Sequence, residues 1–175
     1  MKVLNIEIKV KSSDADSVRK LLLSRNARFA GEDHQVDTYF NVPKGRLKLR
    51  EGTIENKLIY YERDDKSDPK ESRIILYNPT PGSSLKDILT SSLGIKVVVD
   101  KKREIYFIDN VKFHIDSVAE LGSYVEIEAI SEEGKIGRDT LVKQCNEYMR
   151  LFGIPDADLV HCSYSDLLLE KKRQQ

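Results

Sequence analysis

The strongest constraint in this sequence is an alternation of charged and apolar residues with a period of two. Arg46, Lys48 and Arg50 are separated by Leu47 and Leu49. The same alternation recurs over residues 3–11, 111–116 and 125–128. A two-residue period is typical of β-strands, because successive side chains point to opposite faces. The segments therefore predict a sheet with one charged face and one apolar face.

The remaining pattern predicts about eight strands, joined by turn-rich stretches, and four helices. We expect a helix after Ser13, with Asp16 completing a capping box, that runs to about Phe29. Gly94 is expected to end a second helix. The segment 64–72 is interpreted as a loop near an opening of the sheet. The expected strands cover 3–11, 34–41, 45–51, 56–63, 71–78, 95–108, 111–118 and 123–130, and the other helices 84–93, 134–152 and 164–169.

The amphipathic helices need an apolar surface, and the apolar face of the sheet is the largest one available. The helices should therefore cover that face. About eight strands with short connections can curl until the charged face lines an interior, which gives a closed barrel. The predicted fold is α+β, an eight-stranded antiparallel β-barrel, or tunnel, with helices packed on its outside. An open sheet with its charged face in water remains the alternative, because spacing does not prove closure.

Length and charge limit the function classes. The chain has 175 residues, of which 39% are hydrophobic, so we expect a single domain over residues 1–175. Lys plus Arg and Asp plus Glu each number 29, so no net charge favours nucleic acid or an anionic membrane. No apolar run approaches 18 residues, and the two cysteines form no CxxC pair. These features predict a cytoplasmic protein without disulfides or zinc.

The charged face has the chemistry of a phosphate site. Side chains at i, i+2 and i+4 of a strand project side by side, roughly 7 Å apart, and can bind successive phosphates. Arg46, Lys48 and Arg50 have this spacing. The chain lacks a GxxxxGK[ST] loop and a GxGxxG turn, so side chains would have to hold the phosphates. Oxygen ligands suited to Mg²⁺ or Mn²⁺ are offered by Glu7, Asp116, Glu126 and Glu128.

These motifs resemble the CYTH family, also called triphosphate tunnel metalloenzymes, which includes class IV adenylate cyclases and thiamine triphosphatases. The family's N-terminal ExExK strand is matched by residues 5–9, where Glu7 and Lys9 fit and Asn5 replaces the first acidic residue. The resemblance extends over about residues 3–169. Further matches, in order, are residues 37–40, 46–51, 101–106, 114–116, 122–128 and 163–168.

The resemblance implies roles for individual residues. The divalent metal, Mg²⁺ or Mn²⁺, would be held by Glu7, Glu126 and Glu128. Lys9, Arg50, Lys101 and Arg103 would bind the phosphates, with Lys48 and Arg46 as further candidates. Arg63 would replace a lysine that the family often carries at the end of the fourth strand. Asp116 resembles the acidic residue near metal and substrate in the cyclases, so the implied catalytic set is Asp116, Arg50, Lys101 and Arg103.

The implied activity is conversion of ATP to cyclic AMP and pyrophosphate, as in class IV adenylate cyclases. One alternative is hydrolysis of tripolyphosphate, thiamine triphosphate or a nucleoside triphosphate. Another is a non-catalytic polyphosphate-binding module, which Asn5 favours because a charged ligand is lost there. The expected partner is a small-molecule triphosphate. We expect no binding to nucleic acid or to a membrane, and a homodimer is a possible assembly. His114, Tyr106 and Tyr164 are interpreted as structural residues, with a proton relay as the alternative for His114.

Overall fold

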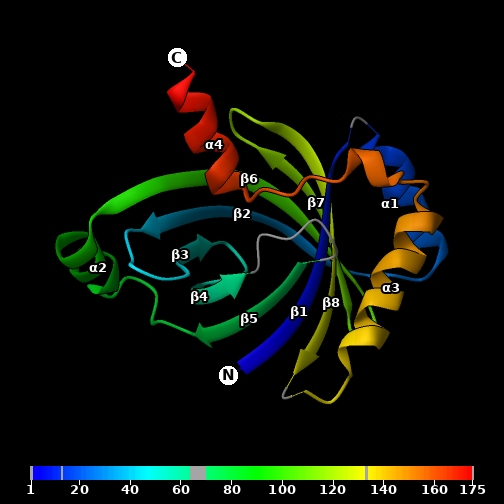
Figure 1. Cartoon of the computed structure of the whole chain (residues 1–175), viewed down its shortest axis with the longest axis horizontal. Coiled ribbons are helices and arrows are strands. Elements are labelled where there is room, and N and C mark those ends of the chain that lie inside the picture. Colours follow the sequence, from blue (N-terminus) through cyan, green and yellow to red (C-terminus); the bar gives the residue numbers. More distant parts are fainter. Residues whose placement is uncertain (1, 13, 64–69, 133, 175) are drawn as a thin grey trace.

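The computed structural model describes residues 2–12, 14–63, 70–132 and 134–174. In this part of the chain, helices alternate with groups of strands (Figure 1). The strands are β1 (Lys2–Lys11), β2 (Arg28–Phe40), β3 (Arg46–Gly52), β4 (Lys57–Arg63), β5 (Lys70–Tyr77), β6 (Ile95–Ile108), β7 (Val111–Val118) and β8 (Gly122–Glu132). The helices are α1 (Ala15–Ser24), α2 (Leu85–Leu93), α3 (Arg138–Leu151) and α4 (Tyr164–Arg173), with a short 3₁₀ turn at Asp156–Asp158.

The strands form a closed antiparallel barrel in the order β1-β5-β4-β3-β2-β6-β7-β8. Closure depends on β1, which pairs with β5 on one side and with β8 on the other. In the second pairing, Glu7 lies opposite Glu128 and Lys9 opposite Glu126. Closure confirms the predicted α+β tunnel fold and leaves no unpaired sheet edge.

The main hydrophobic core lies between the outside of the barrel and two helices. Ile6, Phe113 and Ile127 point outward and pack with Leu22 of α1 and Leu141 of α3. Figure 1 shows α1 and α3 on the same side of the barrel, beside β1 and β8. Burial of each such side chain contributes about 1.5–3 kcal/mol. The apolar face is therefore covered by helices, as the sequence predicts.

The last helix, α4, packs on residues of the inner face of the barrel and not on its outer face. Val97 and Val99 point inward, in phase with Lys101 along β6. They form a second core with Tyr164 and Leu168 of α4. A capping box at the start of α4 fixes where this helix begins. It therefore covers one end of the barrel, whereas the sequence placed all helices on the outer face.

Several boundaries differ from the sequence expectation. The first helix ends at Ser24, and Arg28 and Phe29 already belong to β2. The ring of Phe29 packs on Tyr106 of β6, with centroids 4.9 Å apart, a tertiary contact that local spacing does not reveal. Asp14 caps α1 by accepting a hydrogen bond from the Ser17 amide. Ser13, the expected cap, and residues 64–69 of the expected loop lie outside the described residues, and α3 begins four residues later than expected.

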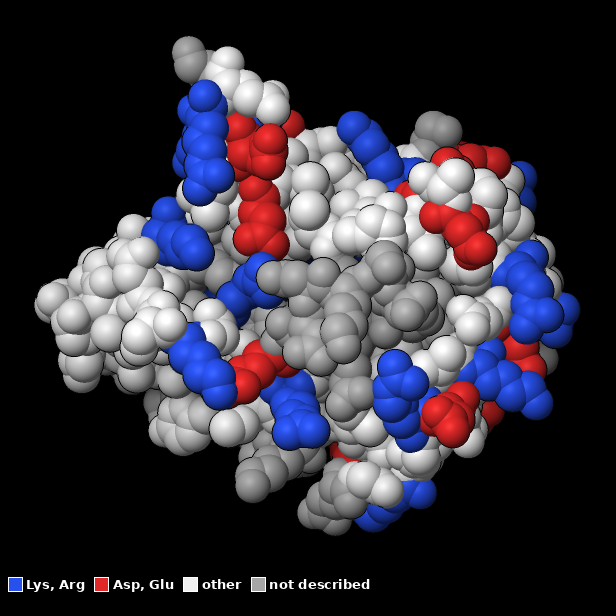
Figure 2. Space-filling model, in the orientation of Figure 1, with Lys and Arg blue, Asp and Glu red and all other residues white. Residues whose placement is uncertain are grey.

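The outer surface mixes charges of both signs. Among the residues coloured in Figure 2, basic and acidic side chains are interspersed over the face that is shown. In the described part of the chain, no helix is both long and apolar enough to span a bilayer. The largest concentration of buried charge is instead inside the barrel.

Candidate active site

The inward side chains enclose a cavity of about 300 Å³. Its basic lining residues, among those described, are Lys9, Lys48, Arg50, Lys57, Lys101, Arg103 and Lys112. The acidic ones are Glu7, Asp37, Glu55, Glu126, Glu128 and Glu132. The barrel thus brings together eight of the sequence-predicted site residues: Glu7, Lys9, Lys48, Arg50, Lys101, Arg103, Glu126 and Glu128.

Asp37 of β2 organises three of the cations. Its carboxylate accepts two hydrogen bonds from Arg50, at 2.8 and 2.9 Å. Lys48 and Lys101 donate to the same carboxylate, at 2.9 and 2.8 Å. Burial alone would raise the pKa of Asp37, but these three cations hold it well below its usual range. The carboxylate therefore fixes the positions of the cations from inside the protein.

Lys101 is a buried cation whose pKa depends on the charges around it. It is 2% exposed, and burial lowers its pKa to about 7. Asp37 opposes this shift, whereas the nearby guanidinium groups of Arg50 and Arg103 add to it. An added anion would favour the charged form of Lys101.

A second cluster surrounds Arg103. Its guanidinium donates to both oxygens of Asp116, at 2.7 and 2.6 Å, and to Glu126 at 2.7 Å. The Tyr164 hydroxyl donates to Asp116 at 2.7 Å. Asp116 is 1% exposed and is not among the described residues that line the cavity. The structure gives Asp116 a positioning contact with Arg103, and its catalytic role stays a prediction.

A third cluster brings in a carboxylate from the turn between β3 and β4. Glu55 accepts hydrogen bonds from Lys112 at 2.6 Å and from Arg50 at 3.1 Å. Asp33 holds this turn by accepting from the amides of residues 54 and 55, at 2.8 and 3.0 Å. A Cβ at Gly52 would lie 2.7 Å from Asp33 Oδ1, so the close approach requires glycine.

The residues suited to a cation lie where β7 and β8 meet. His114, Glu126 and Glu128 offer ligand atoms that all lie within 4.8 Å of one another. Burial and Glu126 raise the pKa of Glu128, whereas burial and Arg103 lower the pKa of His114 to about 4 despite Glu126. Asn5 Oδ1 and His114 Nε2 are buried polar atoms without a hydrogen-bond partner among the described residues. The donor set of one imidazole and two carboxylates fits a divalent cation.

Two predicted phosphate ligands are placed differently. Arg46 forms an ion pair with Asp166 of α4 at 2.9 Å and lines a separate cavity of about 80 Å³. The side chain of Arg63 lies outside the described residues. The role of each in substrate binding stays a prediction.

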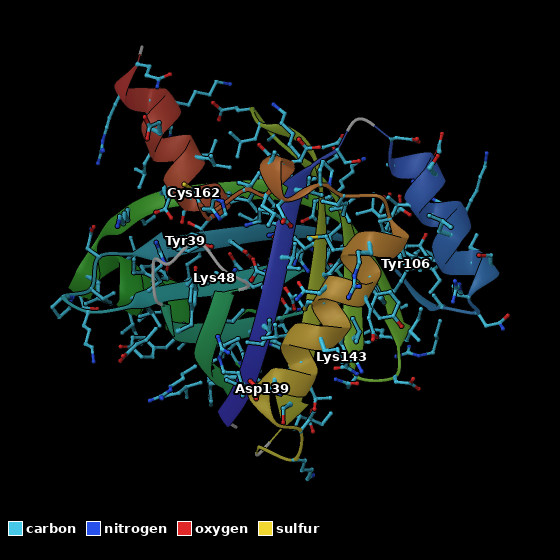
Figure 3. The ribbon with its side chains drawn as sticks, turned by 45° about the vertical axis from the view of Figure 1, so that its right-hand side comes forward. Tyr39, Lys48, Tyr106, Asp139, Lys143 and Cys162 are labelled. Atoms are coloured by element: carbon cyan, nitrogen blue, oxygen red, sulfur yellow. The ribbon has the colours of Figure 1, made fainter. Side chains whose placement is uncertain are left out.

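Sequence reasoning gave no role in the site to Asp37, Glu55, Lys112 or Tyr164 and treated His114 as structural. The strand pairing indicates that two of these residues belong to the site. Asp37 lies opposite Arg50, and His114 lies opposite Glu126. Tyr106 points to the outer core, which agrees with its structural interpretation. In Figure 3, Tyr39 and Lys48 are labelled among the strands to the left of β1, and Tyr106 is labelled to the right of α3.

The cavity also has an apolar wall. Residues of three neighbouring strands, β1, β5 and β4, place aliphatic or aromatic side chains on the lumen. These are Val3, Ile59, Tyr61, Ile74 and Leu76. We call this set the apolar wall, and we call Lys9, Lys48, Arg50, Lys101 and Arg103 with their carboxylate partners the charged wall. One cavity thus offers two kinds of binding surface.

Comparison with known families agrees with this geometry. The CYTH domain model matches residues 4–164. The chain belongs to the CYTH family. This confirms the resemblance drawn from the sequence and supports triphosphate processing by a metal-dependent tunnel as the general function. No curated protein is similar enough in sequence to match this chain.

Solved structures share the fold over nearly the whole chain. A protein of Pyrococcus horikoshii OT3 is 24% identical, with a TM-score of 0.80 over 93% of this chain and 98% of its own. A proposed adenylate cyclase of Vibrio parahaemolyticus is 17% identical, with a TM-score of 0.73 over 94% and 97%. A proposed adenylyl cyclase from Hippeastrum with a dominant triphosphatase activity is 13% identical, with a TM-score of 0.59 over 98% and 96%. These similarities show the fold alone.

Proposed function

We propose that this chain is a metal-dependent enzyme that converts ATP to cyclic AMP and pyrophosphate. The observation that carries the proposal is the presence of the charged wall and the apolar wall in one cavity. Cyclisation requires the nucleoside and the α-phosphate to lie inside the protein together. An apolar surface beside the cations provides a place for the nucleoside, which inorganic tripolyphosphate would not need.

The charge of the cavity suits a metal-bound polyanion. The described lining contains seven basic and six acidic side chains, so the formal excess is one positive charge. A divalent cation would increase this positive excess to about three. This is close in magnitude, and opposite in sign, to the charge of a triphosphate. Guanidinium groups such as Arg50 and Arg103 can bind phosphate oxygens bidentately. The carboxylates that now pair with them hold them in position before substrate arrives.

Glu126 and Glu128 would hold the cation, and Glu7 lines the same cavity opposite Glu128 on the neighbouring strand. When bound, such an ion polarises phosphoryl oxygens and orients the phosphate chain. The ion would be Mg²⁺ or Mn²⁺, both of which accept carboxylate oxygen ligands.

In the proposed reaction, the ribose 3′-oxygen forms a bond to the α-phosphorus while the bond from that phosphorus to the β-bridging oxygen breaks. Pyrophosphate leaves with the bonding electrons. Lys101, Arg103 and Arg50 stabilise the charge that develops on it. Both oxygens of Asp116 already accept hydrogen bonds, and Glu126 and Glu128 are assigned to the cation, so the 3′-hydroxyl proton passes to solvent water.

The engagement of Asp116 also favours a second candidate, hydrolysis of the terminal phosphate. Arg103 and Tyr164 both donate hydrogen bonds to Asp116, the acidic residue that the resemblance links to the cyclases. In this second reaction a water, in place of the ribose hydroxyl, is the nucleophile. The Hippeastrum protein, named for a dominant triphosphatase activity, is similar in fold.

Product analysis tests the proposal. The protein is incubated with ATP or with tripolyphosphate, in the presence of Mg²⁺ or Mn²⁺, and the products are separated by chromatography. Cyclic AMP and pyrophosphate from ATP support cyclisation, whereas ADP and orthophosphate overturn it in favour of hydrolysis. Binding of both compounds without any product would favour a polyphosphate-binding module.

A further inference from the structure

His114 is placed in the cavity wall in a way that a structural histidine does not require. Its side chain is 1% exposed, and it lines the cavity. Nδ1 lies 3.0 Å from Glu126 Oε2 and 3.5 Å from Glu128 Oε1. Nε2 is buried and has no hydrogen-bond partner among the described residues. Nδ1 is therefore the nitrogen that faces both carboxylates, and a ligand shared with them would bind His114 through this atom.

The strands hold these three side chains rigidly. His114 of β7 lies directly opposite Glu126 of β8, and Glu128 follows two residues along the same face. On the other side of β8, Glu7 lies opposite Glu128. Ligands placed on paired strands keep their separation without the entropic cost of ordering a loop.

The separations match those around a small divalent ion. Two ligand atoms each about 2.1 Å from an octahedral ion lie about 3 Å apart when they are neighbours. The two distances from Nδ1 to the carboxylate oxygens, 3.0 and 3.5 Å, are near this value. A single hydrogen bond to Glu126 would explain the first distance, but it would not explain the approach of the second carboxylate to Nδ1.

Neighbouring cations do not block such a site. Arg103 also donates to Glu126 Oε2, at 2.7 Å, and Lys9 lies 3.2 Å from Glu126 Oε1. Each carboxylate oxygen has two lone pairs, so Glu126 can keep Arg103 and still bind an ion. Glu128 lines the cavity, and its ion-pair contact given among the described residues is His114 Nδ1 at 3.5 Å.

We propose that His114 binds the divalent cation together with Glu126 and Glu128, and that this nitrogen ligand makes the site prefer Mn²⁺ to Mg²⁺. The inference rests on the proposed metal dependence and adds the ligand set and the ion. Mg²⁺ strongly prefers oxygen ligands, whereas imidazole nitrogen suits transition metals. Asn5 gives a neutral amide where a further carboxylate would favour Mg²⁺, and His114 supplies a ligand from the opposite side of β8.

Pulsed EPR on Mn²⁺ tests the proposal directly, because imidazole coordination modulates the electron spin echo at ¹⁴N frequencies. The chain has only three histidines, and the other two, His34 and His161, are exposed. The wild-type protein with one equivalent of Mn²⁺ should show the ¹⁴N modulation. His114→Gln should lose it, whereas the matched His34→Gln and His161→Gln double variant, in which His114 is the only histidine, should keep it.

The outcomes separate this inference from the proposed function. If Mn²⁺ binds to the wild type without ¹⁴N modulation, or if the modulation persists in His114→Gln, His114 is not a ligand of the ion. Neither result contradicts the proposed function. If wild-type protein binds no Mn²⁺, even with a non-cleavable triphosphate, the proposed metal dependence fails as well. The double variant retains His114, so the test stays decisive if His114→Gln does not fold.

Titration calorimetry tests the preference between ions. The ratio of Mn²⁺ to Mg²⁺ affinity should exceed one in the wild type and fall about tenfold in His114→Gln, where an amide oxygen replaces the nitrogen. An unchanged ratio would contradict the selectivity, whatever the absolute affinities.

Discussion

The charged wall and the apolar wall line one cavity but are built in different ways. Each cation of the charged wall is fixed by a protein carboxylate, as Arg50 and Lys101 are by Asp37. On the apolar wall, Ile59 and Ile74 present only hydrocarbon to the same lumen. The difference teaches that the phosphate half of the site is preorganised by electrostatics, whereas the other half can discriminate only by shape and apolar contact.

This contrast assigns different kinetic effects to the two walls. Groups of the charged wall act where charge develops in the transition state, so their loss should reduce the rate. Contacts of the apolar wall are equal in the ground and transition states, so their loss should weaken binding of the organic group only. Variants of each wall, and the pH dependence of binding, test this division.

The largest effect is expected for Glu126→Gln. The variant removes a negative ligand but keeps the size of the side chain, so metal-dependent turnover should fall on the order of a thousandfold. Steady-state rates at increasing Mn²⁺ measure this, and thermal unfolding checks that the fold is intact. Activity within a few-fold of wild type at saturating metal would show that Glu126 is not a ligand.

Arg50→Ala should have the next largest effect. Loss of a bidentate guanidinium contact should cost about 2–4 kcal/mol of transition-state stabilisation, measured as kcat/KM for ATP. Arg73→Ala is the matched control, because Arg73 is an exposed arginine on β5. Equal effects of the two variants would remove Arg50 from the site.

The apolar wall is tested by Ile74→Ala. Loss of an apolar contact to the nucleoside should raise KM for ATP about tenfold, with kcat and the affinity for tripolyphosphate nearly unchanged. Ile75→Ala is the control, because Ile75 is the next residue on β5 and is 50% exposed. A parallel loss of tripolyphosphate affinity would contradict the division into two walls.

The smallest effect concerns pH. Lys101 has a pKa near 7, so it is charged below that pH and loses its charge as pH rises through it. Triphosphate affinity should therefore fall about fivefold between pH 6 and pH 8. Lys101→Arg keeps its charge over this range and should remove this part of the dependence. Calorimetry with tripolyphosphate measures both proteins, and identical pH profiles would exclude Lys101 as the titrating group.

Most of the charged wall could be predicted from the sequence, because strand alternation indicates the faces of Arg50 and Glu126, and the family resemblance implies Lys101. The carboxylates that pair with these cations could not be predicted in this way. Asp37 lies 13 residues before Arg50 and 64 before Lys101. Glu55 reaches the lumen because Asp33 folds the intervening turn. Such partners depend on which strands are neighbours in the barrel, and the spacing of residues along one strand does not indicate its neighbours.

The sequence by itself determined which residues share a face, because a period of two is a property of the extended backbone. It also determined the family, through motifs that stay in order along the chain. The positions of α4 at one end of the barrel, of Asp116 against Arg103 and of His114 near two carboxylates follow from the three-dimensional fold. The physical reason is that closure of the barrel sets distances across the lumen between residues far apart in the chain, and those distances decide which charges pair and which remain available to a ligand.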